Sequence, residues 1–277
     1  MKLKQLFTIL CLLCTMATNA QGFEQDRIRY RISDENTVAV TKFYYKGDIT
    51  IPESVNHRGH DFKVTSIEDQ AFSQCIWLTS ITIPNSVTNI GNGAFMECSG
   101  LTSVTFGDNV TSIGDGAFYG CKELTSITMP DCLTDIGQIA FAGCIGLTSI
   151  NIPNSVTNIG IGAFLACSGL TSITIPNSIT CIADGVFCGC TGLKSITIPE
   201  SVKSIGSEAF SECTELRNIT IGNSVTHIGA EAFYGCEQLK EIILADGLTS
   251  IGNNAFNNCT ALESIIIPSS VTNVESF

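Results

Sequence analysis

The sequence predicts an α/β, β-rich solenoid, in which stacked coils of 23 residues contribute parallel strands and one short helical turn each. Nine cysteines, from Cys75 to Cys259, recur every 23 residues, and a phenylalanine stands three residues before each of them. Segments such as Ile81-Thr82-Ile83 alternate apolar and hydroxyl side chains, which is typical of a strand with one buried face. One such unit buries too little apolar surface to fold alone, so the period indicates a stack of coils.

Each element of a coil can be placed within residues 78–98, which read LTSITIPNSVTNIGNGAFMEC. We expect a first strand over residues 78–83, ended by Pro84 because proline lacks the N–H that a strand ladder needs. A second brief strand is expected around Val87 and Ile90 on the opposite wall. The remaining GAFMEC is long enough only for a helical turn, with its Ala and Phe pointing inward.

A glycine follows the second strand in seven of nine coils, which indicates a tight turn there. Glu68 and Ala183 occupy the other two places, so we expect no backbone conformation that only glycine can adopt. The Phe, Cys and Leu positions of each coil are predicted to form the core. Representative members are Phe95, Cys98, Leu101, Phe118, Cys121, Leu124, Phe164, Cys167 and Leu170.

The two ends of the chain differ from the middle. Residues 1–20 combine Lys2 and Lys4, a short apolar run and Ala20, which predicts a cleavable signal peptide, and the run is too short to span a membrane. Residues 21–50 are predicted to form a β-hairpin-like cap, and residues 51–277 a solenoid of about nine full repeats, the last one incomplete. NHRGHDFKV interrupts the first coil as a hairpin or loop. No polar cap is visible at the other end, where the last coil is either closed by self-association or frayed.

The repeat motif LxxIxIPxxVxxIGxxAFxxC resembles that of the BspA-like, or treponemal-type, leucine-rich repeat of bacterial surface proteins, from about residue 51 to residue 277. The resemblance implies a curved, right-handed α/β leucine-rich-repeat solenoid. It also implies a secreted or cell-surface location, and protein binding or adhesion to matrix proteins and other bacteria rather than catalysis. The motif of that family fixes no binding residues, so none are carried over.

Composition excludes several functional classes. A net charge of −12 argues against nucleic-acid binding, and no segment after the signal peptide is long enough to span a membrane. No catalytic constellation is present, so we predict neither an enzyme nor a cofactor. His57, His60 and Asp61 stand far from His227 and from the pair Cys188 and Cys190, so we predict no metal site.

The repeated cysteines are predicted to be free, buried thiols. Stacked coils hold equivalent residues about 4.8 Å apart with parallel side chains, whereas a disulfide needs Cβ atoms about 3.8 Å apart and turned toward each other. Cys181 and Cys188 are the only two cysteines whose pairing is worth checking.

The outward positions of the first strand carry the strongest functional hint. In most coils they are Ser and Thr, which suit an exposed strand and are also found on ice-binding solenoids. Toward the C-terminus this pattern breaks, through decay of a terminal repeat or because the region binds a partner. The predicted partner-binding residues are Lys194, Arg217, Lys240, Glu241, Ile243, Glu263 and Ile266.

The function predicted is that of an adhesin-like binding protein, secreted or at the cell surface, whose rigid repeat surface binds an extracellular or surface protein. The alternatives are a structural component that self-associates, and a glycan-binding module. The last is disfavoured because the outward face carries no aromatic residues for stacking on sugars.

Overall fold

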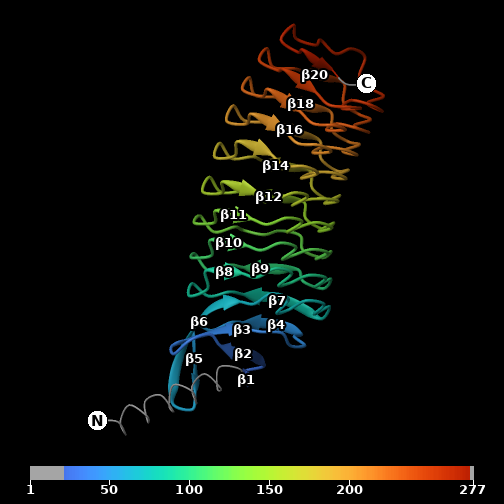
Figure 1. Cartoon of the computed structure of the whole chain (residues 1–277). Helices are drawn as coiled ribbons and strands as arrows, with labels where there is room; N and C mark the ends of the chain where they lie inside the picture. The colour runs from blue at the N-terminus through green and yellow to red at the C-terminus, as the bar shows by residue number, and fades with distance from the viewer. Residues whose placement is uncertain (1–21, 275–277) are drawn as a thin grey trace, which may run out of the picture.

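The structure is a computed structural model that describes residues 22–274, so the predicted signal peptide lies outside the described residues. Its coils stack into one elongated solenoid (Figure 1). The first strand of each coil builds one wall, which we call the first wall. Its strands are β4 (Gly47–Thr50), β7 (Leu78–Thr82), β9 (Ser103–Thr105), β12 (Ser149–Asn151), β14 (Ser172–Thr174), β16 (Ser195–Thr197), β18 (Asn218–Thr220) and β20 (Glu241–Ile243).

The second strand of each coil builds the second wall. Its strands are β3 (Thr37–Val40), β6 (His60–Ile67), β8 (Asn89–Ile90), β10 (Ser112–Ile113), β11 (Asp135–Ile136), β13 (Asn158–Ile159), β15 (Cys181–Ile182), β17 (Ser204–Ile205), β19 (His227–Ile228), β21 (Ser250–Ile251) and β22 (Asn273–Val274). Strands of consecutive repeats that pair do so in parallel and in register, so that Ser80 lies opposite Ser103 and Ser112 opposite Asp135. The first wall comprises three separate sheets and the second wall two. The predicted stack of parallel coils is therefore confirmed.

The N-terminal end is built differently. β1 (Gly22–Gln25) pairs antiparallel with β2 (Ile28–Ile32), which pairs antiparallel with β3, and β3 continues the second wall beside β6. β5 (Ser54–His57) and β6 form a hairpin that turns between His57 and His60, as the insertion in the first coil suggested. The ring of Phe23 stacks on His57 with centroids 4.1 Å apart, which packs the hairpin against β1.

A column of phenylalanine rings fills the solenoid from Phe72 to Phe256. Successive ring centroids lie 4.8–5.7 Å apart, and most rings are nearly parallel. The residues chosen above to represent the core are all fully buried, namely Phe95, Cys98, Leu101, Phe118, Cys121, Leu124, Phe164, Cys167 and Leu170. The C-terminal end of the core is less completely buried than its middle. Leu262, Ile265 and Val271 of the last coil are only partly buried.

The predicted helical turn is wrong: residues 22–274 contain no helix. The segment that contains Phe95 is a series of turns, in which the N–H of Phe95 donates to the carbonyl of Ala117 in the next coil, at 2.7 Å. Gly93 and Glu97 both have φ of +57°, in the left-handed region, and left-handed residues recur at these two places in all nine coils. Since right-handed helices exclude such residues, alternate N–H groups of the segment point to the neighbouring coil instead.

The glycine after the second strand serves close approach rather than a turn. Gly91 does not have positive φ, which agrees with the expectation that this position requires no glycine-only conformation. A Cβ at Gly91 would lie 2.5 Å from the backbone nitrogen of Asp69 in the preceding coil, so a side chain would push the coils apart. Where Ala183 replaces this glycine, the second wall is interrupted, because β13 ends one sheet and β15 begins another.

Replacing Ala183→Gly is therefore expected to stabilise the protein by about 1–1.5 kcal/mol. Two restored backbone hydrogen bonds at about 1 kcal/mol each outweigh the extra chain entropy of glycine, which costs about 0.5–1 kcal/mol. Urea unfolding followed by circular dichroism measures the change. The matched control is Gly206→Ala, whose Cβ would lie 2.7 Å from the backbone nitrogen of Asp184 and which should destabilise. Equal losses in both variants would contradict this explanation of the interruption.

All twelve cysteines between Cys75 and Cys259 are free, including Cys181 and Cys188. In eight successive coils the thiol donates to the carbonyl of the phenylalanine 26 residues earlier, as from Cys98 Sγ to Phe72 O at 3.0 Å. Burial is the main cause that raises the pKa of Cys98 and of Cys167 to about 12.

These thiols predict that the protein loses stability in alkali. Folding raises their pKa above the unfolded value of about 9, so their stabilisation is complete below pH 9 and is lost as the pH rises toward 12. Each thiol removes about 1.4 kcal/mol per pH unit in that window. Between pH 7.5 and 10.5 the free energy of unfolding of the wild-type protein should fall as the pH rises. In Cys98→Ala/Cys167→Ala the fall should be less steep, by an amount that corresponds to about two titrating protons. An unchanged slope in that variant would exclude the thiols as the cause.

Candidate interaction surface

The first wall presents a face of hydroxyl side chains to solvent. On each strand the central residue, such as Ile196, is buried and the residues on either side of it point outward. These outward residues stack in register from coil to coil, with Ser195 over Asn218 and Thr197 over Thr220. The face is uncharged at these two positions from β7 to β18.

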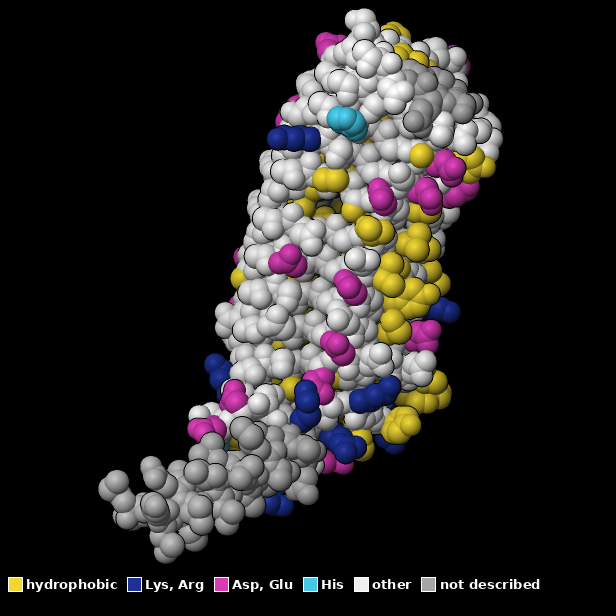
Figure 2. Space-filling model, in the orientation of Figure 1, with side chains coloured by type: hydrophobic (Ala, Val, Ile, Leu, Met, Phe, Trp, Pro, Cys, Tyr) yellow, Lys and Arg dark blue, Asp and Glu magenta, His cyan; other side chains and the backbone are white. Residues whose placement is uncertain are grey.

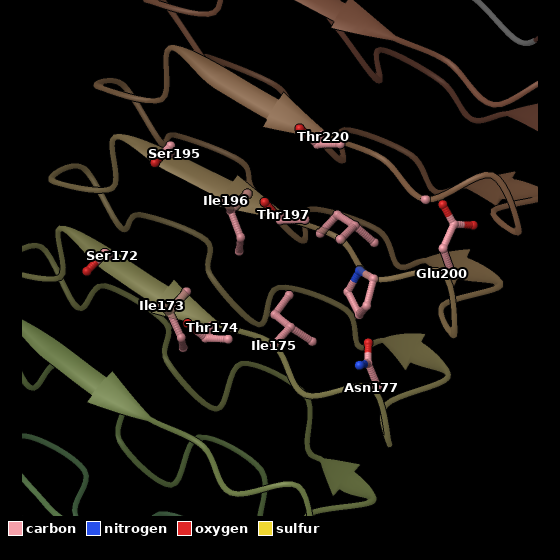
Figure 3. Close-up of a pocket in the computed structure, with 13 residues that line it drawn as sticks. Ser172, Ile173, Thr174, Ile175, Asn177, Ser195, Ile196, Thr197, Glu200 and Thr220 are labelled. Atoms are coloured by element: carbon pink, nitrogen blue, oxygen red, sulfur yellow. The ribbon is translucent and has the colours of Figure 1, made fainter.

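A trough runs along the end of these strands, where each strand meets the corner that usually contains proline. Its largest hollow has a volume of about 570 Å³ and is bordered by Thr174, Asn177, Thr197, Glu200 and Thr220 (Figure 3). Hollows of about 340, 410 and 270 Å³ lie at the same corner of other coils. All of them are open to solvent, so the trough suits an extended surface rather than an enclosed small molecule.

Three of the seven predicted binding residues come together at the C-terminal end of the trough. Glu241 and Ile243 both point outward from β20, and Ile266 occupies the place of Ile243 in the next coil. The two isoleucines are 74% and 84% exposed, and all three residues line the hollow of about 270 Å³ together with Asp246. We call Glu241, Ile243 and Ile266 the isoleucine patch.

The other four predicted residues form a separate column. Lys194, Arg217, Lys240 and Glu263 stand just before the first-wall strand in four successive coils, are exposed and do not line that hollow. The guanidinium of Arg217 pairs with Glu215 at 3.1 Å. The structure thus places three cations beside the isoleucine patch rather than within it.

Sequence reasoning missed two features of this face. Threonines in the charged column of earlier coils are structural, since the Thr102 hydroxyl donates to the carbonyl of Thr79 at 3.0 Å and Thr171 bonds Thr148 in the same way. The trough also carries carboxylates, among them Asp108 and Asp131, at its proline corner. The only signal for them was a recurrent Asn or Asp directly after the proline position.

The residues considered as metal ligands do not converge. His57 packs on Phe23, His60 Nε2 contacts the carbonyl of Glu35 at 2.8 Å, and His227 bonds Thr226. Cys190 is fully buried in the thiol column. Within the described part of the chain, no three His, Cys, Asp or Glu residues gather in a way that would hold a metal ion.

Comparison with known proteins agrees with this architecture. The sequence profile of the BspA type leucine rich repeat region matches residues 65–193 and 157–277, in six copies. The chain belongs to the BspA-type leucine-rich repeat family. No curated protein sequence matches it.

Solved structures of leucine-rich repeat proteins are similar over most of the chain. One from Bacteroides ovatus is 29% identical with a TM-score of 0.71, covering 91% of this chain and 88% of its own. The T. pallidum leucine-rich repeat protein is 27% identical with a TM-score of 0.63, covering 79% and 91%. The pneumococcal vaccine antigen PcpA, at 22% identity, a TM-score of 0.62 and coverage of 93% and 78%, shares the fold.

Membership of this family also indicates the general kind of protein. Leucine-rich repeat solenoids of this family are repeat scaffolds consistent with protein–protein interaction at surfaces. Residues 22–274 contain no helix that is long and apolar enough to span a membrane.

Proposed function

We propose that this BspA-type protein is an exported, adhesin-like module that binds an extracellular or surface protein through the isoleucine patch and the trough beside it. The observation that carries the proposal is the exposure of Ile243 and Ile266, at 74% and 84%. The equivalent residues of most other coils are threonines such as Thr220, so the fold does not require an apolar side chain there.

The charges around the patch support a protein partner. Protein interfaces commonly surround an apolar centre with a polar, solvent-accessible rim. Here Lys194, Arg217 and Lys240 lie along one side of the patch and Asp246 along the other. A partner with apolar anchors and mixed charges fits this arrangement.

The substitution Ile243→Thr/Ile266→Thr is expected to weaken binding to an immobilised basement-membrane extract at least tenfold, because it removes the apolar centre. Unfolding free energy should stay within about 0.5 kcal/mol, since both side chains are exposed. Biolayer interferometry and urea unfolding measure the two quantities. The matched control is Thr105→Ile/Thr128→Ile, which adds the same side chains to earlier coils and should leave the affinity unchanged. Equal binding by wild type and the threonine variant would refute the patch.

Self-association is the second candidate, and a different observation favours it. Leu262, Ile265 and Val271 are partly exposed at the end of the stack, whereas the corresponding Leu239 and Ile242 are buried. A second copy covering this end would bury them. Sedimentation velocity at several concentrations separates the candidates, because a strict monomer leaves only the first.

Export is proposed from the sequence of residues 1–20. If that segment is a signal peptide, the protein purified from its native source should begin at or near Gln21, and N-terminal sequencing measures this directly. Recovery of Met1 as the first residue of the native protein would contradict export through this route.

A further inference from the structure

A second surface is apolar although the fold does not require apolar residues there. It lies on the series of turns that follows the second wall, in the middle coils of the stack. We call Met96, Tyr119, Ile139, Ile161 and Leu165 the turn-edge strip. Figure 2 shows hydrophobic side chains gathered along one edge of the stack at mid-height, with acidic side chains beside them toward the C-terminal end.

The strip is continuous across coils. A Cβ on Gly116 would contact both Met96 Cε, at 3.4 Å, and Ile139 Cδ1, at 3.8 Å. A Cβ on Gly162 would likewise contact Ile139 Cγ2 at 3.2 Å and Leu165 Cβ at 3.7 Å. The side chains of Met96, Ile139 and Leu165 therefore lie over these two glycines and join into one row.

The fold does not call for apolar residues at these places. The positions equivalent to Leu165 hold Ser73 and Ser211 in outer coils, and those equivalent to Ile161 hold Asp69 and Asp184. Outside residues 96–165 most of these positions are polar or acidic, although Tyr234 stands at the place of Leu165 and Ala230 at that of Ile161. An apolar row confined to the middle coils is thus a property of this surface and not of the repeat.

Two members of the strip are locally unfavourable. Ile139 has φ of +46°, a region that β-branched residues rarely adopt, where Gly116 and Gly162 stand in the neighbouring coils. Ile161 replaces residues whose side-chain oxygen accepts the N–H of the next coil, as Asp115 Oδ1 accepts from Gln138 at 2.7 Å. Side chains kept in place against such costs indicate a role outside folding.

The charges at the strip's end are negative. Glu208 and Glu212 occupy turn positions of the second coil beyond Leu165, and Glu231 one of the third. Burial and then the carboxylates of Glu208 and Glu212 raise the pKa of the thiol of Cys188, which stands at the place of Leu165 in the next coil. The ion pairs among residues 22–274 are Arg31–Glu68 and Arg217–Glu215, so neither neutralises this acidic group.

The distance between successive coils matches the repeat of an α-helix lying along the strip. Phenylalanine rings directly behind the strip advance by 5.3 Å from Phe118 to Phe141 and by 5.6 Å from Phe141 to Phe164. An α-helix advances about 5.4 Å per turn. A helix lying along the stack therefore presents one apolar residue of each turn to each successive coil.

We propose that the turn-edge strip binds an amphipathic α-helix of a partner protein, with an apolar face of about four turns and lysines or arginines at the end that meets Glu208, Glu212 and Glu231. This surface is distinct from the isoleucine patch, so the two proposals stand or fall separately.

The test uses the full chain and a fluorescein-labelled 18-residue peptide of Leu, Ala and Lys, with leucines at positions i, i+4, i+7 and i+11 and lysines clustered at one end. Fluorescence anisotropy should show saturable binding, lost on scrambling the peptide and weakened at least fivefold when its lysines are replaced by glutamates. Equal binding of the scrambled peptide, or no binding of the designed one, would overturn the proposal.

The matched variant is Ile139→Gly/Ile161→Asp/Leu165→Ser, in which each new residue already occupies the same position of another coil. It should fold with at least wild-type stability, because the glycine relieves the left-handed isoleucine, and should bind the peptide at least tenfold more weakly. Ile243→Thr/Ile266→Thr should bind it as wild type does. Unchanged affinity in the triple variant would refute the strip as the site. Strip-dependent binding to phosphatidylcholine vesicles without peptide binding would refute a helical protein partner in favour of a lipid surface.

Discussion

Every part of this solenoid depends on one constraint, the repetition of backbone hydrogen bonds between neighbouring coils in a 23-residue register. The first wall, the second wall and the turns after it all form such bonds, so each residue lies over its equivalent in the next coil. A side chain that does not fit therefore disturbs the packing of two neighbouring coils. The requirement for glycine after the second strand follows from this, because a Cβ there would lie within 2.5 Å of the preceding backbone at Gly91.

The cysteine column follows from the same constraint. The carbonyl of Phe95 accepts the N–H of Cys98 in its own coil and the thiol of Cys121 in the next, both at 3.2 Å. A thiol is small enough for the fully buried position and supplies the donor that satisfies the second lone pair of that carbonyl. Alanine would lack the sulfur atom and would leave the carbonyl with one partner. The period of cysteines is thus a packing and hydrogen-bonding device, which explains why the thiols stay free.

The sequence was sufficient for the strands, the core and the family, because inward residues repeat at fixed spacing. It was misleading for the segment after the second wall. A Phe-x-x-Cys spacing places two side chains on one side in a helix and equally in a series of turns, and the left-handed residues that decide between them include Glu97 and Ile139, which carry no such signal. For the binding surfaces, Ile243 and Ile266 could be found because they interrupt a regular row. The turn-edge strip could not, since its positions vary from coil to coil and become one surface only when the coils are stacked.

The interruption of the second wall lies next to residues of the turn-edge strip. Two departures from the repeat fall in the same interval: Ala183 stands where a glycine allows close approach, and Ile161 stands where an oxygen accepts the N–H of the following coil. Between them β13 and β15 belong to separate sheets, while the turns remain bonded through Phe164 N–H and Val186 O at 2.9 Å. Since Ile161 is 51% exposed and is not part of the buried core, its presence is not explained by the core. The weakest interval of the wall thus adjoins the apolar strip, and the stack tolerates it because each coil is held at three places rather than one.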